Sequence, residues 1–336
     1  MASERKKTWV ARFVDTRDDR ELIIRARKRL MKLEDESYAD WLYFDNPAGN
    51  LRAMLAMDGE VVAGQYVVVP LNFWLDGEKV TGTLSLDTVT HEDYRNQGIF
   101  TGLAEALFSR INDQGIQFTI GFPNENSRPG FLGKLHFEQP CSFHGFYRPV
   151  VPMPDWAIGL RRSVTRLPFL GRIETTDCPD EAWLEGMWAK EREQKSATML
   201  KDAKFVRWRY AQNPAQNYRF MTMSRRNGDP VGYVVWNEKS EPAPIGLSTS
   251  LMDVVASDPL SAHVLLSAWI EEVRGRATLL KAYATIPTLE SAILMASGFI
   301  PYGRKTFIAR DHSSNQEMRR RLLRKWPISK VYSDVF

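Results

Sequence analysis

Apolar residues follow a helical period in two places along the chain. They recur at i, i+3 and i+4 spacing over residues 100–111 and again over 265–273, which predicts an amphipathic helix in each place. Residues 83–90 (T-L-S-L-D-T-V-T) and the short apolar runs 118–122 and 279–284 are typical of strands. The pattern therefore predicts a chain in which strands and helices follow one another.

A ten-residue motif occurs twice in the sequence. Residues 41–50 read W-L-Y-F-D-N-P-A-G-N and residues 208–217 read W-R-Y-A-Q-N-P-A-Q-N, with six identical positions at an offset of 167 residues. After each copy we expect a strand, a charged turn, and a second strand that carries Gly64 or Gly232. Because the same order of elements follows each copy, the chain is predicted to contain two copies of one α/β unit.

The boundary between the two copies is expected in a proline-punctuated segment. Pro149, Pro152, Pro154 and Pro168 argue against a long regular element there. The tail is basic and amphipathic, and we expect Leu322, Leu323 and Trp326 to pack on the body of the protein. The predicted parts are an N-terminal domain at 1–150, a linker at 151–172, a second domain at 173–312 and the tail at 313–336.

Composition narrows the class of protein. The 336 residues are 43% hydrophobic and 26% charged, which is average for a globular protein and excludes a disordered chain. Two cysteines, Cys141 and Cys178, are too few for a disulfide framework and not spaced as zinc ligands. We see neither a signal peptide nor a membrane span, so a cytoplasmic protein without metal or membrane partner is expected. The net charge of +4 permits an anionic ligand without requiring nucleic acid.

One strand, loop and helix in the first half form a candidate anion site. The strand at 83–90 is followed by H-E-D-Y-R-N-Q-G-I-F-T-G and then by the predicted helix. The first N–H groups of a helix lack intrahelical partners, and the helix dipole adds about half a positive charge. Pyrophosphate is a natural ligand of such a site. Gly98 could equally serve only to relieve a turn.

The run from Tyr94 to Phe100 (Y-R-N-Q-G-I-F) resembles the R/Q-x-x-G-x-G/A loop of the GNAT superfamily of acyl-CoA-dependent N-acyltransferases. The resemblance covers residues 8–148, and the second half resembles a degenerate copy. It implies an α/β (α+β) fold of two GNAT-like domains, each a mixed, mostly antiparallel sheet flanked by helices. It also implies acetyl-CoA or another short acyl-CoA as co-substrate.

In this family the loop amides hold the CoA pyrophosphate, and the preceding strand pairs with the pantetheine arm. Family members also often place an Asn on CoA before the next helix, where Asn126 or Ser127 could instead be an ordinary helix cap. By resemblance, the cofactor-binding residues are Thr88, Val89 and Thr90 for pantetheine, Arg95, Gln97, Gly98, Ile99, Phe100 and Thr101 for the phosphates, and Asn126.

Two positions of the first half depart from the family pattern, and the second half lacks the loop. Phe100 replaces the last Gly/Ala of the loop and is expected to narrow the approach to the backbone. Leu132 stands where the family usually has a Tyr that protonates the departing thiolate. Tyr147 or water could replace it, since a thiol with a pKa of about 8.5 is a fair leaving group. The second half has Asp258 and no glycine in its loop, so we expect it to be structural, with Asp258 capping a helix.

Acyl transfer to an amine needs a proton acceptor and a place for the oxyanion. Asp87, in the strand just before the pantetheine contacts, is the first candidate base, although Asp253 at the matching place in the second half supports a structural role. His91 is the second candidate, with an unperturbed pKa of about 6.5, and its alternative is a solvated loop residue. The oxyanion is expected to meet the backbone N–H of Val89 or Thr90.

Trp41 and Tyr43 of the repeated motif are candidate acceptor contacts, because aromatic rings stack on sugars and bases. Their occurrence in both halves favours a structural role, with the helix ended by Asn-Pro. Cys141 and His144 form a C-x-x-H pair, but without a third partner a buried Cys is more typical of packing than of nucleophilic catalysis.

The sequence therefore predicts an N-acyltransferase that moves an acetyl or other short acyl group from acyl-CoA to a small-molecule primary amine. An amino sugar is the first candidate acceptor, by analogy with tandem GNAT-like proteins. One alternative acceptor is an aminated nucleobase in modified DNA. Another alternative is a non-catalytic acyl-CoA sensor or scaffold, motivated by Phe100 and Leu132. The oligomeric state is left open.

Overall fold

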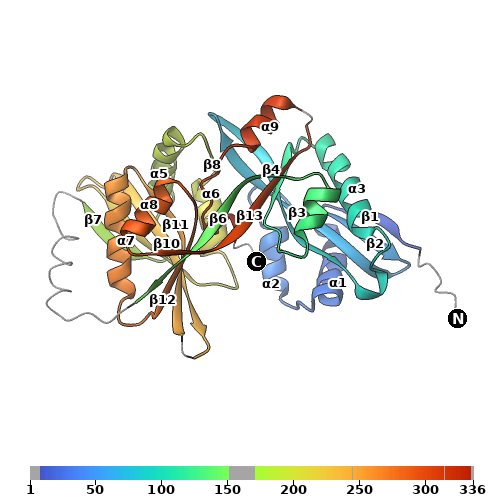
Figure 1. The fold of residues 1–336 in the computed structure, drawn as a ribbon, viewed down its shortest axis with the longest axis horizontal. Coiled ribbons are helices and arrows are strands. Elements are labelled where there is room, and N and C mark those ends of the chain that lie inside the picture. The colour runs from blue at the N-terminus through green and yellow to red at the C-terminus, as the bar shows by residue number, and fades with distance from the viewer. Residues whose placement is uncertain (1–7, 151–170, 244, 314, 334–336) are drawn as a thin grey trace. The chain divides into compact units, whose positions relative to one another are not determined.

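The computed structural model of the chain describes residues 8–150, 171–243, 245–313 and 315–333. Figure 1 shows the strands and helices that these residues form. Almost all of the linker expected at 151–172 lies outside the described residues.

The first half runs through a strand, two helices, three strands, a helix, a strand, a short helix and a final strand. These are β1 (Val10–Val14), α1 (Arg20–Met31), α2 (Glu36–Tyr43), β2 (Arg52–Asp58), β3 (Val61–Leu75), β4 (Glu78–Thr90), α3 (Ile99–Asp113), β5 (Phe118–Gly121), η3 (Gly130–Lys134) and β6 (Glu138–Pro149), with the single turns η1 (Arg17–Asp19) and η2 (Glu92–Tyr94).

The second half repeats this order of elements, with one additional short strand, β8. The elements are β7 (Arg172–Thr176), α5 (Glu181–Gln194), β8 (Ala197–Met199), α6 (Ala203–Val206) continued by η4 (Arg207–Ala211), β9 (Tyr218–Ser224), β10 (Pro230–Glu241), β11 (Gly246–Ala256), α7 (Pro259–Val273), β12 (Leu279–Thr285), α8 (Leu289–Ala296) and β13 (Ile300–Asp311). The repeated order predicted from the duplicated motif is therefore present in the fold.

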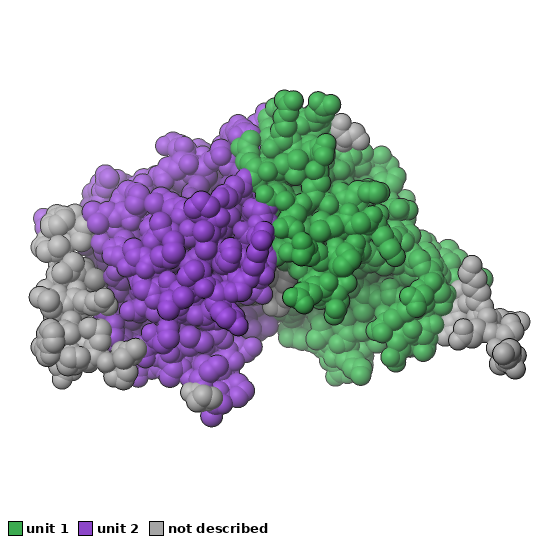
Figure 2. All heavy atoms as spheres, in the orientation of Figure 1, with its two compact units in different colours: residues 1–73, 79–140, 306–324 green, residues 74–78, 141–305, 325–336 purple. Residues whose placement is uncertain are grey.

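The chain forms two compact units, coloured separately in Figure 2, that do not follow the two halves of the sequence. The end of β13 pairs with β5, with Ile308 opposite Gly121, and β6 pairs with β12, with Pro149 opposite Leu279. Each unit is thus completed by the last strand of the other half, which the predicted domain boundaries did not anticipate. Unit 1 comprises residues 1–73, 79–140 and 306–324, and unit 2 comprises residues 74–78, 141–305 and 325–336.

Each unit contains a mixed sheet with one parallel pair of strands. In unit 1 the strand order is β1-β2-β3-β4-β5-β13, and β4 and β5 are parallel. In unit 2 the order is β6-β12-β11-β10-β9-β7, and β11 and β12 are parallel. The other pairs whose registers are resolved in these units are antiparallel. The predicted fold class, a mixed and mostly antiparallel sheet flanked by helices, is confirmed.

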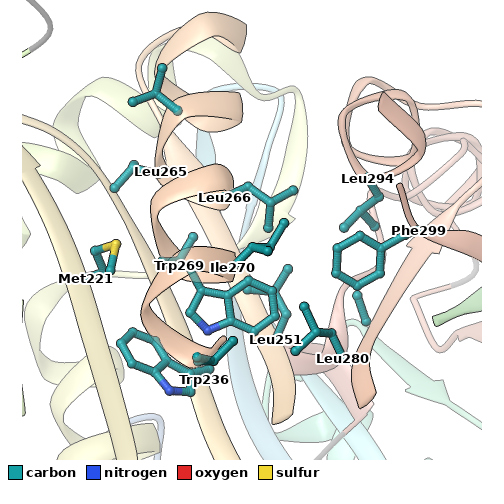
Figure 3. Close-up of a cluster of buried hydrophobic side chains, with 14 of the residues drawn as sticks. Met221, Trp236, Leu251, Leu265, Leu266, Trp269, Ile270, Leu280, Leu294 and Phe299 are labelled. Atoms are coloured by element: carbon teal, nitrogen blue, oxygen red, sulfur yellow. The ribbon is translucent and has the colours of Figure 1, made fainter. Parts of the chain in front are cut away.

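The amphipathic helices pack as their periodicity predicts. In unit 1, α3 buries Leu103, Ala104, Leu107 and Ile111. In unit 2, Leu266, Trp269 and Ile270 of α7 lie in one cluster with Trp236, Leu251 and Leu280 of the sheet (Figure 3). Since a fully buried large apolar side chain contributes roughly 1.5–3 kcal/mol, these faces hold each helix on its sheet.

The repeated ten-residue motif has the same local structure in both places. Asn46 and Asn213 are buried, and the side-chain oxygen of each accepts the backbone N–H two residues later, from Ala48 and Ala215, at 2.9 Å. This side-chain hydrogen bond forms the turn after Asn-Pro. The repetition of these contacts supports a structural role for the motif.

The C-terminal tail contains α9 (Gln316–Leu322) and α10 (Lys330–Ser333). Leu322 and Trp326 are buried as expected, but Leu323 is 38% exposed, because the position after Leu322 lies on another side of the helix. No helix in the described parts of the chain is long and apolar enough to cross a membrane.

Candidate functional site

In unit 1 the parallel strands β4 and β5 pair over a short distance only. Their ladder joins Thr83–Ser85 to Thr119–Gly121, and β4 continues through Thr90 beyond it. Residues Thr88, Val89 and Thr90, predicted to meet pantetheine, lie in this last part of β4 and are half-buried. The end of β4 can therefore accept an extended ligand as an added strand.

The start of α3 packs closely against β3 and the end of β4. A Cβ atom built on Gly64 would lie 2.9 Å from Cγ2 of Ile99 and 3.1 Å from the carbonyl oxygen of Val89. One residue earlier, the carbonyl oxygen of Ala63 accepts the N–H of His91 at 2.9 Å. Gly64 is thus the residue that lets the loop, the strand end and the helix start come together.

The loop before α3 leaves the helix N-terminus accessible. Gly98 is the N-cap residue, with φ of 74°, and no side chain caps the helix. A Cβ on Gly98 would have nothing within 4 Å, and no acidic residue lies in the first turn of α3. Free N–H groups at the positive end of a 15-residue helix suit a polyphosphate, so this loop fits the CoA pyrophosphate.

Two side chains of the loop could add to this site. Arg95 is exposed. The amide oxygen of Gln97 is buried and has no hydrogen-bond partner within the described residues. It can accept only an N–H or O–H of a ligand, whereas a phosphate oxygen needs the N–H₂ group of the same amide.

Phe100 was expected to narrow the approach to the loop backbone, but its side chain lies in the core. Its ring contacts Phe131 and Tyr66, with centroid separations of 5.5 and 6.0 Å, and lies 3.0 Å from the position of a Cβ on Gly130. The side chain is therefore turned into the core cluster of unit 1, where Leu132 also packs. The absence of a side chain at Gly130 provides the room for this ring.

Asp87 lies in a buried network with two residues from the helices of the first half. The guanidinium of Arg27 donates to Oδ2 of Asp87 at 2.9 Å and to the hydroxyl of Tyr43 at 2.8 Å. The Tyr43 hydroxyl donates to the same carboxylate oxygen. Asp87 has a positive φ of 46°, and its carbonyl oxygen accepts the side-chain amide of Gln65 at 2.8 Å. The carboxylate is therefore fixed in position, with its side chain 15% exposed.

Burial determines the protonation chemistry of this network. It raises the pKa of the Asp87 carboxyl above its usual value, although the Tyr43 hydrogen bond and the Arg27 charge oppose the rise. Burial also raises the pKa of Tyr43 well above its usual value, so Tyr43 stays a hydrogen-bond donor. A carboxylate with a raised pKa is a stronger proton acceptor than a solvated one.

The other predicted residues of unit 1 lie in different settings. His91 is the N-cap of η2, and its Nδ1 accepts the N–H of Asp93 at 3.4 Å. Asn126 is exposed, and the capping interaction expected of it or Ser127 is made by Asn124, whose side-chain oxygen accepts the Ser127 N–H at 2.9 Å. Trp41 is 3% exposed, which leaves little of its surface available to contact an acceptor. Tyr43 is buried in the core, where its hydroxyl donates to Asp87.

Tyr147 and Cys141 belong to unit 2. Tyr147 lies on β6 opposite Lys281, and its ring is 5.7 Å from that of Tyr302. Burial raises the pKa of the Cys141 thiol, which disfavours the thiolate that a nucleophilic role requires.

The helix in unit 2 that corresponds to α3 begins differently. Asp258 caps α7, accepting the backbone N–H of Ser261 at 2.8 Å and its hydroxyl at 2.6 Å, and Pro259 occupies the first turn. The predicted cap is confirmed. A carboxylate at this position repels phosphate and takes up the N–H groups that would bind it.

Arg27 and Gln65 complete the Asp87 network, and neither is singled out by the sequence analysis. The sequence pattern could have identified Arg27, because it lies on the apolar face of α1 with the buried residues Leu22, Ile23 and Ala26. A buried arginine on an apolar face usually has a buried anionic partner.

Comparison with known proteins agrees with the predicted family. Residues 15–139 match the family described as acetyltransferase (GNAT) domain. No curated protein matches the sequence. Solved structures with a similar fold include two GCN5-related N-acetyltransferases. The one from Anabaena variabilis has 12% identity over 90% of this chain and 73% of that chain, with a TM-score of 0.65, and the one from Kribbella flavida has 15% identity over 91% and 73%, with a TM-score of 0.61. The Saccharomyces cerevisiae N-myristoyltransferase with bound myristoyl-CoA has 9% identity over 91% of this chain and 84% of that chain, with a TM-score of 0.59.

At these identities the solved structures establish a common fold over almost the whole chain, and the family match covers the loop at 94–101, Asp87 and Arg27. Residues 15–139 are thus a GNAT acetyltransferase domain, within a chain whose overall fold is that of the GNAT N-acyltransferases.

Proposed function

We propose that this protein transfers an acetyl or other short acyl group from acyl-CoA to a primary amine, using a site in unit 1. The observation that carries the proposal is the uncapped N-terminus of α3 beside the extended end of β4. A polyphosphate ligand and an extended arm are the two parts of CoA that these features suit.

This arrangement supports the following proposed contacts with CoA. The N–H groups at Ile99, Phe100 and Thr101 would bind the pyrophosphate, with Arg95 and Gln97 beside them. The backbone of Thr88–Thr90 would pair with the pantetheine arm. The bound thioester supplies an activated acyl group, and the protein holds its carbonyl against β4.

The backbone suggests which N–H meets the oxyanion. The N–H of His91 is taken by Ala63 on β3. Because consecutive N–H groups of an extended strand point to opposite sides, the N–H of Thr90 points away from β3. Of the two predicted groups, this favours Thr90 over Val89 as the oxyanion donor.

Asp87 is the proposed proton acceptor, directly or through one water. The attacking amine forms its bond to the acyl carbon while the carbonyl electron pair moves to the oxygen, and the amine's surplus proton passes to Asp87. Collapse of this oxyanion restores the carbonyl and breaks the bond to the thiol sulfur. Arg27 and Tyr43 hold the carboxylate in one orientation during this step. Solvent water protonates the departing thiolate, which needs no strong acid near neutral pH because a thiol has a pKa of about 8.5.

An amino sugar is the proposed acceptor. The experiment measures release of free CoA thiol from acetyl-CoA with a panel of amino sugars, aliphatic amines and an oligonucleotide that carries an aminated base. Turnover with an amino sugar that is insensitive to salt supports the proposal. Turnover with the oligonucleotide alone, weakening steeply as salt rises, would replace the acceptor, and CoA binding without turnover of any amine would make the protein a sensor.

A further inference from the structure

Unit 2 contains a cavity at the place that corresponds to the proposed CoA site of unit 1. Its parallel strands β11 and β12 pair only from Ser248–Ser250 to Leu279–Lys281, and β11 continues through Ala256. A cavity of about 110 Å³ begins at Leu251, where the ladder ends. In both units the two parallel strands thus separate beyond a short ladder, and in unit 2 a cavity lies where they separate.

One part of the cavity is apolar. A cavity of about 150 Å³ lined by aliphatic and aromatic side chains binds benzene, so a volume of about 110 Å³ suits a short alkyl chain or, with small adjustments, a single ring. The apolar lining is contributed by β11, α7 and α8 and includes Met252, Val254, Ala262, Leu266, Ile293 and Leu294.

The other part of the lining contains a buried group of charges. The ammonium of Lys201 lies 2.6 Å from Oδ2 of Asp253 and 2.9 Å from Oε1 of Glu191. All three side chains are 5–7% exposed. Ser329 donates to the other oxygen of Asp253 at 3.0 Å. With both carboxylates ionised, this trio carries two negative charges and one positive charge. Burial raises the pKa of the Glu191 carboxyl, opposed by the charge of Lys201 and helped by that of Asp253, so a ligand cation beside the two carboxylates would favour the ionised form of Glu191.

The remaining charged residues of the lining do not restore neutrality. Lys195 and Glu290 form an ion pair at 2.5 Å, and Asp258 adds the carboxylate that caps α7. An anionic ligand, CoA included, would meet this excess of carboxylates and a helix N-terminus that is already capped. A cation, in contrast, would reduce the cost of burying the excess charge.

We propose that this cavity of unit 2 is a second ligand site, which binds a small amine cation with an apolar body, its ammonium directed at Asp253 and Glu191. The acyl-transfer proposal concerns unit 1, so the two can fail separately. The site needs no phosphate on its ligand and is distinct from the CoA loop of unit 1.

The test uses the full chain and three probes of similar size and different charge: benzylamine, benzyl alcohol and benzoate. Isothermal titration should show saturable 1:1 binding of benzylamine, at least about tenfold weaker binding of benzyl alcohol, and weaker binding still of benzoate, because charge-assisted hydrogen bonds are roughly twice as strong as neutral ones. Saturating CoA should not displace benzylamine. Absence of saturable benzylamine binding, equal binding of benzoate, or displacement by CoA would overturn the proposal.

Two variants locate the binding. Ala262→Phe fills the cavity and should abolish benzylamine binding, whereas Ala182→Phe, at an exposed alanine of α5, should leave it unchanged. Asp253→Asn removes the excess charge and should lower benzylamine affinity at least about tenfold while benzyl alcohol binding stays unchanged. Unchanged benzylamine binding by a folded Ala262→Phe protein would contradict the site. If Ala262→Phe does not fold, Asp253→Asn decides the matter, because this variant leaves Asp87 and the proposed acceptor site of unit 1 intact, and unchanged benzylamine affinity in it would contradict the site.

Discussion

Asp87 in unit 1 and Asp253 in unit 2 occupy corresponding strands but have different partners. Asp87 is held by Arg27 and Tyr43. Asp253 is held by Lys201 and Ser329, and the hydroxyl of Tyr210, at the place in the motif that matches Tyr43, makes no hydrogen bond within the described residues. The scaffold therefore keeps a buried carboxylate in both units, while the residues that balance its charge have changed.

The N-termini of α3 and α7 also differ between the two units. Gly98 leaves the first turn of α3 uncapped, whereas Asp258 caps α7. A cap of this kind stabilises a helix by about 0.5–2 kcal/mol. Unit 1 thus lacks a modest stabilisation at the helix start that is proposed to bind the phosphates, whereas α7 of unit 2 has this stabilisation.

The largest expected effect is on the carboxylate of unit 1. Asp87→Asn keeps the shape of the side chain and removes the proposed proton acceptor. It should lower kcat about 10²- to 10⁴-fold with little change in the KM for acetyl-CoA, measured by thiol release. Asp113→Asn, at an exposed carboxylate at the end of α3, is the control. A kcat within threefold of the natural protein would make Asp87 purely structural, as the comparison with Asp253 allows.

A single substitution at Gly98 can give α3 the acidic N-cap that α7 has. Gly98→Asp places a carboxylate at the N-cap of α3, as in unit 2, and should weaken acetyl-CoA binding about 10- to 100-fold by repulsion of the phosphates. Gly98→Asn is the neutral control, since Asn and Asp both tolerate a positive φ. Equal affinities of the Asp and Asn variants in calorimetry would show that phosphate does not lie at this helix start.

Close packing at a glycine is common to both units. A Cβ on Gly64 would lie 2.9 Å from Ile99 Cγ2, and one on Gly232 would lie 2.7 Å from the carbonyl oxygen of Val255. Alanine at either position should destabilise the fold by about 1–3 kcal/mol, measured by urea denaturation. Only Gly64→Ala should also weaken acetyl-CoA binding, and an equal effect of Gly232→Ala on binding would remove the functional difference between the units.

The acid stability of unit 1 depends on a partly buried histidine. His312 accepts or donates a hydrogen bond with Thr119 at 2.7 Å, and burial, helped by the charge of Arg310, lowers its pKa to about 3. The unfolded chain binds this proton below a pH of about 6.5 and the folded chain does not. The contribution of His312 to stability is therefore present above pH 6.5 and is lost at up to about 1.4 kcal/mol per pH unit as the pH falls toward 3.

His312→Gln retains a polar group for Thr119 but cannot take up a proton. Its free energy of unfolding, measured by urea at several pH values, should fall less steeply below pH 6.5 than that of the natural protein. Parallel slopes for the two proteins would mean that His312 is already protonated in the folded state.

Sequence patterns predicted the faces of α3 and α7, the repeated order of elements and the cap at Asp258, because each depends on neighbours within a few residues. They did not predict the exchange of last strands between the units, since the period of a strand determines its buried face but not its partner. Arg27 and Asp87 lie 60 positions apart, so their pairing has no local pattern. Phe100 was expected to narrow the loop, and its ring turns inward because a distant residue, Gly130, leaves room for it.

The most direct test of one acyl-CoA site in unit 1 is the stoichiometry of acetyl-CoA binding to three proteins by calorimetry. Gly98→Trp should cover the helix start. Gly115→Trp, at the other end of α3, is matched to it, with a similar φ of 78° and equally open surroundings. A single acyl-CoA site in unit 1 predicts one bound acetyl-CoA per chain in the natural protein and in Gly115→Trp, and loss of binding in Gly98→Trp. Two sites per chain, or unchanged binding by Gly98→Trp, would contradict it.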